Sequence, residues 1–364
     1  MTDNMMSGEI ELTDVKLQTI ATRVLNTFKL AAEKGIAHHA EPTQYPMPTR
    51  PNVIEEIFLT QFKQLTPVQQ RTGVAEVMES LNAPPAERRR VYGDLARISL
   101  RSADAVEDQV KAIALPESLK LSPQEIERLA QQFQSDIDPE PVPGVVKPAP
   151  QALAAAQPLK KLELRIHEVK CLSEMKLEPG GDEILLGGST VDAVGTVKLV
   201  KEFKVRDGFH KGVVKSYSPP KQFAVFDLTA GKTFPKSYFV TFLLGEQDWG
   251  GFADVLNKLV DRVKEKVIEA ISTALGVGIG SLIGSTIPGL GTVIGLVVGW
   301  IIGKLVGWLK KLWQDDVFPP KTVHVKIPSL PAHWKGKTDS PEQTILFTYY
   351  GGKYQLKYDW RMFS

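Results

Sequence analysis

The chain has 364 residues, 43% of them hydrophobic, and a formal net charge of +2. This size and composition suffice for about two or three domains with their own cores. The near-neutral charge excludes a strong overall field of the kind that steers binding to nucleic acid, so nucleic acid is not an expected partner. The single cysteine, Cys171, excludes an internal disulfide, so the fold does not depend on an oxidising compartment.

Residues 1–16 lack the basic segment and apolar run of a secretory signal. We therefore expect synthesis in the cytoplasm without a signal peptide, with the protein membrane-associated or released and delivered when it is active. Over residues 1–135, apolar positions recur at three-to-four spacing, which predicts a helical N-terminal domain. Within it, Ser122 and Glu125 have the spacing of a capping box that opens a last helix.

Residues 136–158 are rich in Pro and Ala and predict a semi-rigid linker. From Leu159 onward apolar and polar residues alternate, which is typical of strands with one buried face. Short strands separated by Gly- and Pro-bearing turns predict an antiparallel β-sandwich over residues 159–248 and 318–364. Gly351-Gly352, between two such runs, predicts a hairpin with a two-residue turn.

Residues 249–317 interrupt the strands with a different pattern. An amphipathic helix is predicted over residues 250–269, and no charged residue then occurs until Lys304. One membrane-spanning helix needs about 20 apolar residues, so the uncharged run is long enough for two short spans. Pro288-Gly289, near its middle, is typical of a turn. The pattern predicts a hydrophobic α-helical hairpin inserted into the sandwich.

Glycines recur at intervals of four residues on both sides of Pro288. They are Gly276, Gly280 and Gly284 before the proline, and Gly291, Gly295, Gly299, Gly303 and Gly307 after it. Such rows let helices approach closely in bilayers, whereas a glycine inside a helix in water costs about 1 kcal/mol relative to alanine. Lysines flank both ends of the run, and Trp300, Trp308 and Trp313 suit a membrane interface. We therefore expect these glycines, Pro288 and the three tryptophans to be the membrane-inserting residues.

A soluble explanation of the hairpin stays open, because buried hairpins in large soluble proteins are also apolar on all sides. A hairpin that is sheltered in the soluble form and inserts later satisfies both interpretations. The sequence has no GxSxG or HExxH motif, so we predict no enzyme activity and no cofactor. Four acidic residues of predicted sandwich loops are calcium candidates: Asp182, Glu183, Asp192 and Asp207. Their spacing lacks a DxDxD pattern, which favours ordinary turn carboxylates and no metal site.

Two segments, Cys171–Gly188 and Tyr354–Trp360, resemble uncharacterised bacterial β-sandwich proteins. The resemblance covers roughly residues 160–364 and implies a sandwich fold but no known activity. The glycine-rich hairpin resembles those of membrane-inserting toxins such as pore-forming colicins, whose soluble form hides an apolar helical hairpin. Colicin pore domains are all-helical, so the resemblance implies the principle of a sheltered hairpin and no individual residue role.

These patterns predict an α+β protein with a helical N-terminal domain and an antiparallel β-sandwich that carries an inserted hydrophobic α-helical hairpin. The leading hypothesis is a non-enzymatic, membrane-active protein, specifically a bacterial pore-forming toxin or delivered effector. Its expected partners are membrane lipid, other copies of itself on insertion, and a delivery or shielding partner for the N-terminal domain. The alternative is a binding or structural module whose hairpin is a permanent core, anchor or self-assembly interface. A third hypothesis is an enzyme of unfamiliar type that acts on lipid.

Overall fold

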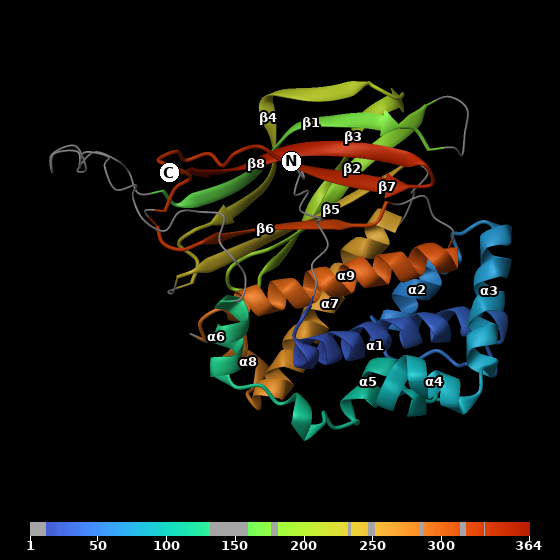
Figure 1. The fold of residues 1–364 in the computed structure, drawn as a ribbon. Coiled ribbons are helices and arrows are strands. Elements are labelled where there is room, and N and C mark those ends of the chain that lie inside the picture. The colour runs from blue at the N-terminus through green and yellow to red at the C-terminus, as the bar shows by residue number, and fades with distance from the viewer. Residues whose placement is uncertain are drawn as a thin grey trace.

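The computed structural model describes residues 12–131, 159–175, 181–231, 234–246, 252–283, 287–313, 318–330 and 332–364. Their elements form three layers, namely a helical layer and two antiparallel four-stranded sheets that lie face to face (Figure 1). The predicted fold class, helices followed by an antiparallel sandwich with later helices, is confirmed. The predicted linker, residues 136–158, lies outside the described residues.

The N-terminal part of the helical layer is a series of helices with short connections. They are α1 (Val15–Ala40), α2 (Ile54–Phe62), α3 (Pro67–Asn82), α4 (Pro85–Tyr92), α5 (Val106–Lys111) and α6 (Pro123–Gln131), with 3-10 helices at Gly93–Arg97 and Glu117–Leu119. The predicted capping box before α6 is present. The Ser122 amide donates to a Glu125 carboxylate oxygen at 2.8 Å, and the Glu125 amide donates to the Ser122 hydroxyl at 3.2 Å.

The strands form an outer sheet of order β4-β1-β8-β7 and an inner sheet of order β3-β2-β5-β6. Their bounds are β1 (Lys161–Ser173), β2 (Asp182–Val191), β3 (Val197–Phe209), β4 (Val214–Asp227), β5 (Lys236–Glu246), β6 (Lys321–Ile327), β7 (Gln343–Tyr349) and β8 (Gly352–Phe363). The predicted β7–β8 hairpin is present, but its turn lies one residue earlier. Tyr350 and Gly351 have φ of 41° and 82°, while Gly352 already pairs with Tyr349.

The inner sheet is covered on both faces because alternate residues of its strands enter different cores. In β5, Phe239 and Leu243 pack against the helices, whereas Tyr238 and Phe242 enter the sandwich core between the sheets. Every residue of β5 except Glu246 is therefore buried, as in strands with both faces covered. The outer sheet covers the other side of the sandwich core.

The inserted region contains α7 (Phe252–Leu275), α8 (Ile279–Ile283) and α9 (Leu290–Trp313). This differs from the expected pair of matched apolar helices joined near Pro288. The amphipathic helix continues to Leu275 and ends where Gly276 adopts a φ of 67°, a conformation that interrupts an α-helix. After it, α8 has only 5 residues. The long antiparallel pair is therefore α7 with α9.

Helix α9 lies at the centre of the molecule, between the inner sheet and the N-terminal helices (Figure 1). It contacts α1, α3, α6, α7 and β5. Its side chains and those of α1 to α6 belong to a single hydrophobic core. Residues 12–131 and the inserted helices therefore fold against each other. The proposed domain boundaries stay a prediction.

Candidate functional site

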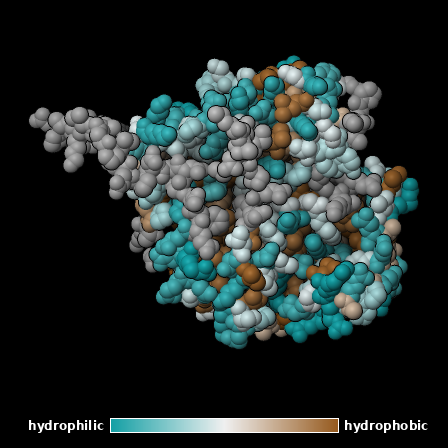
Figure 2. Space-filling model, viewed as in Figure 1, coloured by the Kyte–Doolittle hydropathy of each residue, from teal (hydrophilic) through white to brown (hydrophobic). Residues whose placement is uncertain are grey.

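The apolar face of α9 is almost completely withdrawn from water. Twelve of its aliphatic side chains have exposed fractions below 9%: Leu290, Val293, Ile294, Leu296, Val297, Val298, Ile301, Ile302, Leu305, Val306, Leu309 and Leu312. Among the described residues, α9 is the one helix long and apolar enough to cross a membrane, over Leu290–Leu309. Of its most apolar stretch, 78% is buried inside the fold. On the face of the helical layer visible in Figure 2, most side chains are hydrophilic and hydrophobic ones form separate small patches.

The first turns of α9 use glycine to approach the inner sheet. A Cβ atom at Gly291 would overlap the carbonyl oxygen of Ala193, in the turn between β2 and β3. A Cβ at Gly295 would overlap the Phe239 ring of β5. Just before the helix, a Cβ at Gly289 would overlap the Ala130 side chain of α6. These glycines are therefore required by packing within this fold.

The later turns of α9 are different. Among the described residues, no atom lies within 4 Å of a Cβ placed at Gly303 or Gly307. Gly307 is exposed and Gly303 is half-buried, whereas Gly299 is buried in the same helix. The five glycines of α9 therefore do not form one interface, and packing in this fold gives no reason for the last two.

The glycines before Pro288 do not form a helical row that faces α9. Gly276 ends α7, and Gly280 lies in the short α8 with open space around its Cβ position. Gly284 lies outside the described residues. Pro288 is half-buried in the turn that precedes α9. The structure thus separates the two predicted rows instead of packing one against the other.

Two predicted interface tryptophans lie on α9 beside its open glycines. Trp300 is half-buried, with the Lys304 ammonium 5.8 Å from its ring centroid. Trp308 is also half-buried, and the ammonium of Lys29 from α1 lies 5.9 Å from its ring centroid. Both distances suit cation–π contact. Trp313 is the last residue of α9, and its side chain lies outside the described part of the chain.

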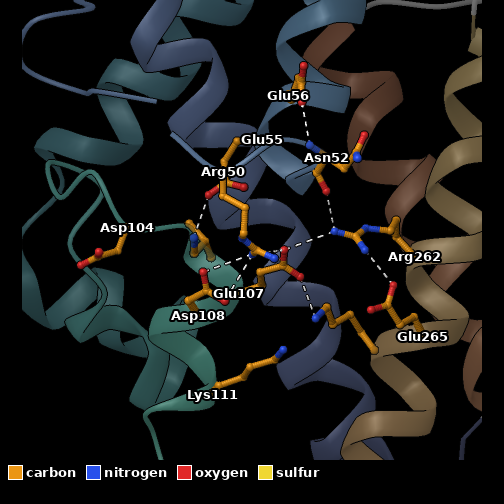
Figure 3. Close-up of polar contacts among 12 residues, drawn as sticks. Arg50, Asn52, Glu55, Glu56, Asp104, Glu107, Asp108, Lys111, Arg262 and Glu265 are labelled. Atoms are coloured by element: carbon orange, nitrogen blue, oxygen red, sulfur yellow. Dashed lines mark hydrogen bonds and ion pairs between the residues drawn. The ribbon is translucent and has the colours of Figure 1, made fainter. Parts of the chain in front are cut away.

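An ion-pair cluster around a buried carboxylate ties α7 to the N-terminal helices (Figure 3). At its centre, the carboxylate of Glu107 in α5 is 3% exposed and pairs with Lys266 of α7 at 2.7 Å. Arg262 of α7 approaches the same carboxylate to 3.2 Å, and Arg50, in the segment before α2, to 2.7 Å. We call these four residues the Glu107 latch. Because an unpaired buried charge is costly, the latch opposes separation of α7 from α5.

The residues of the Glu107 latch shift each other's pKa values. Burial acts to raise the pKa of Glu107, but the hydrogen bond and charge of Lys266, with the charges of Arg262 and Arg50, hold that pKa below its usual value. Burial likewise acts to lower the pKa of Lys266, and its partners Glu107 and Glu269 raise it above its usual value. Both groups therefore stay charged at neutral pH.

A second buried polar contact lies next to the latch. The Lys34 ammonium of α1 donates to the carbonyl oxygens of Ser102 at 2.7 Å and Asp104 at 2.6 Å. Glu55 of α2 accepts a hydrogen bond from the Val106 amide at 2.7 Å. Both side chains are fully buried, and burial raises the pKa of Glu55 and lowers that of Lys34. These contacts fix α1, α2 and the start of α5 together.

A cavity of about 340 Å³ lies between α1, α5 and α7, beside the latch. Glu107, Lys111 and Lys266 line one part of it, and apolar residues such as Ile20 and Val24 line another. Its polar groups are already engaged in ion pairs, including Lys266 with Glu107 and Lys111 with Glu269 at 3.5 Å.

The four calcium candidates have separate environments. Asp182 is buried and accepts hydrogen bonds from the Met175 amide and the Tyr354 hydroxyl. Asp192 accepts from backbone amides in its own turn, and Asp207 pairs with Lys204 at 2.6 Å. Glu183 is exposed. In the part of the chain that the structure describes, no group of three or more His, Cys, Asp or Glu side chains could hold a metal ion.

No protein-family model, no curated protein and no solved structure matches this chain.

The Glu107 latch could not be predicted from the sequence. Glu107 and Lys266 are far apart in the chain, and neither belongs to a motif. One feature of the sequence pointed toward it. Lys266 directly precedes the buried Val267 and follows the buried Val263 by three residues, so it lies at the border of the apolar face of the amphipathic helix. A charge at the border of an apolar face is a candidate for a buried partner, but the sequence does not identify that partner.

Proposed function

We propose that this protein is membrane-active, a pore-forming toxin or delivered effector rather than an enzyme, and that it inserts α9 into a target bilayer. The observation that carries the proposal is the position of α9. A helix of sufficient length and apolarity to cross a membrane is held between the inner sheet and a cover of N-terminal helices. The N-terminal helices then act as the shield of the soluble form.

The energetics of burial supports storage in water and release only into another apolar phase. Each of the twelve buried aliphatic side chains of α9 gains roughly 2 kcal/mol by leaving water. Their exposure together would cost more than the roughly 5–15 kcal/mol that stabilises a typical domain. A bilayer offers the same side chains an apolar environment without the protein core. Release of α9 is therefore coupled to the presence of the membrane.

Gly303 and Gly307 support a second state of α9. In the soluble fold, alanine would fit at both positions and would favour the helix by about 1 kcal/mol each. Packing in this core therefore does not explain why both positions are glycine. In a bilayer, two glycines four residues apart permit close helix contact, as in small-xxx-small interfaces. We assign them to self-association after insertion.

The Glu107 latch fits the role of a closure between shield and hairpin. It lies between α5 and α7, so α7 cannot separate from α5 while its ion pairs are intact. Membrane contact that moves α7 away from α5 would have to separate these charges into water or lipid headgroups.

Dye release from liposomes tests this function, with the variant Gly303→Leu plus Gly307→Leu. A Cβ atom at either position meets no neighbour within 4 Å, so we expect thermal unfolding of the variant to stay close to wild type, and this is measured alongside dye release. We expect wild type to release dye and the variant to lose most of that release, because leucine blocks close helix contact. The matched control places two leucines at exposed positions of α7, Lys258→Leu plus Thr273→Leu, and should still release dye.

Two results would contradict the proposal. The first is an absence of dye release by wild type at neutral pH, at acid pH and with calcium. The second is dye release by the double leucine variant at the wild-type level, which would show that Gly303 and Gly307 have no role in self-association. Gly295→Leu is unsuitable for this test, because its side chain would displace the Phe239 ring and disturb the soluble fold.

The burial of α9 also favours a second candidate function, a non-enzymatic binding or structural module in which α9 is a permanent core helix. Under this alternative, purified protein does not float with vesicles of any composition. Under the same alternative, substitution of Gly303 and Gly307 changes the stability of the helix and nothing else that these assays measure.

A further inference from the structure

β3 and β4 form the same lateral edge of the sandwich. β3 is the first strand of the inner sheet and β4 the first strand of the outer sheet, and residues 210–213 connect them directly. Among the described residues, each of the two strands pairs with a single neighbour, β3 with β2 and β4 with β1. In Figure 1, β4 lies at the top of the molecule, on the side of the sandwich away from the helices. We call residues 197–223 the β3–β4 edge.

The β3–β4 edge has a strong positive charge. Its seven basic residues are Lys198, Lys201, Lys204, Arg206, Lys211, Lys215 and Lys221. Glu202 and Asp207 are its only acidic residues, which gives a net charge of +5 where the whole chain carries +2. The remainder of the chain is therefore net negative, and the near-neutral total conceals a polarised molecule.

Aromatic rings connect the two strands beneath these charges. The Phe203 and Tyr217 rings meet edge to face with centroids 6.5 Å apart. The Lys221 ammonium lies 4.4 Å from the Phe203 ring centroid, and that of Lys215 lies 5.6 Å from the Tyr217 ring centroid. These contacts place cations from β4 over rings of both strands, so the aromatic pair joins the charge of β4 to β3 across the two sheets.

Exposed aliphatic side chains occur within the same edge. Leu199 of β3 is 38% exposed and Val214 of β4 is 37% exposed. Lysines on edge strands also prevent pairing with other chains, which explains the charge but not these apolar groups. Basic residues mixed with aromatic rings and exposed aliphatic side chains are typical of surfaces that bind anionic lipid headgroups.

We propose that the β3–β4 edge docks the protein on bilayers that contain anionic lipid. This inference rests on the proposed membrane function and adds the lipid class that the protein recognises. Lysine ammonium groups contact headgroup phosphates and carboxylates, while Leu199 and Val214 enter the headgroup region. A duplex nucleic acid would also attract the charge, but it offers no environment for the exposed aliphatic side chains, so the surface fits a bilayer better.

Vesicle flotation tests the docking surface without requiring insertion. Wild type should float with vesicles of phosphatidylcholine mixed with phosphatidylserine and not with phosphatidylcholine alone, and added salt should weaken its binding. In the test variant, Lys198, Lys201 and Lys211 are each changed to glutamate. A basic residue near an anionic surface strengthens binding about fivefold, so three reversals should weaken partitioning by roughly a hundredfold or more.

The matched control carries the same charge change on the helical layer, with Lys63, Arg71 and Arg97 changed to glutamate, and should float like wild type. Equal flotation of wild type on both vesicle types would overturn the proposal, as would undiminished flotation of the test variant. A test variant that no longer binds a DNA duplex but still floats with the anionic vesicles would also overturn the proposal. Docking without dye release would instead count against the pore function alone, and release from neutral vesicles would count against the docking surface alone.

Discussion

Glycine has two different roles along a single helix. At Gly291 and Gly295 the absence of a side chain lets α9 approach the carbonyl of Ala193 and the ring of Phe239. At Gly303 and Gly307 the same absence leaves open space. The sequence predicted the periodic row but could not separate these roles, because the partner atoms come from distant strands. The last two glycines have no neighbour in this fold that requires them, and our proposal of a membrane-inserted state rests more on these two than on Gly291 and Gly295.

Glu107→Gln tests the latch. The change leaves Lys266 and Arg262 near a neutral group, and loss of one partner of a buried ion pair costs about 3–5 kcal/mol. Urea denaturation at neutral pH should show a loss of this size. The matched control, Glu265→Gln, removes a half-exposed partner of Arg262 and should change the free energy of unfolding by less than about 1 kcal/mol.

The difference in stability between wild type and Glu107→Gln should depend on pH. The folded pKa of Glu107 is lower than its unfolded value. Its stabilising contribution is therefore fully present above the unfolded pKa of about 4.3 and is lost as pH falls through the folded pKa. The difference between wild type and Glu107→Gln should shrink below that pH, and a difference that stays constant into strong acid would contradict the assigned ion pairs.

Protonation of Glu55 has the opposite effect on the stability of the fold. Burial raises its folded pKa above the unfolded value, so its protonation on mild acidification favours the folded state. Glu55 and Glu107 thus respond to acid in opposite directions within one layer of helices. Mild acid alone should not open the latch, and an acid trigger would have to act below the ordinary pKa of a glutamate.

At the level of elements, the strands were the most predictable part of the sequence. Alternation at Leu162, Leu164 and Ile166 identified β1, because these residues enter the sandwich core while their neighbours face outward. The end of α7 was not predictable in the same way. The uncharged run continues through Gly276, and hydropathy cannot show that the backbone there adopts a positive φ.

Two phenylalanines of β5 allow the attachment of α9 to be tested separately from overall stability. Phe239 faces α9 and Phe242 faces the sandwich core, and both are almost fully buried. Each change to alanine should destabilise the fold by about 3–5 kcal/mol through the cavity it leaves. Only Phe239→Ala should make dye release easier, at lower protein concentration or shorter time. An equal gain with Phe242→Ala would show that general instability, not release of α9, controls leakage.

At the level of the whole molecule, the three layers place the most apolar helix at the position best protected from water. The inner sheet, α1 and α7 enclose α9, and the basic β3–β4 edge lies in the sandwich. The sequence predicted the sandwich and the helical layer but not their joint core. That core depends on contacts between α9 and helices more than a hundred residues earlier in the chain, such as α1 and α3.

We propose that α9 leaves the protein core and enters a bilayer. A fluorescent dye attached through Gly303→Cys tests it directly, because this position has open space and the only native cysteine, Cys171, is buried and can be changed to alanine. A dye attached through Lys63→Cys on the helical layer is the control. On anionic vesicles, we predict that quenchers placed at the bilayer centre reduce emission from position 303 and not from position 63. Continued quenching of position 303 by aqueous iodide, with no effect of the lipid quenchers, would contradict the account.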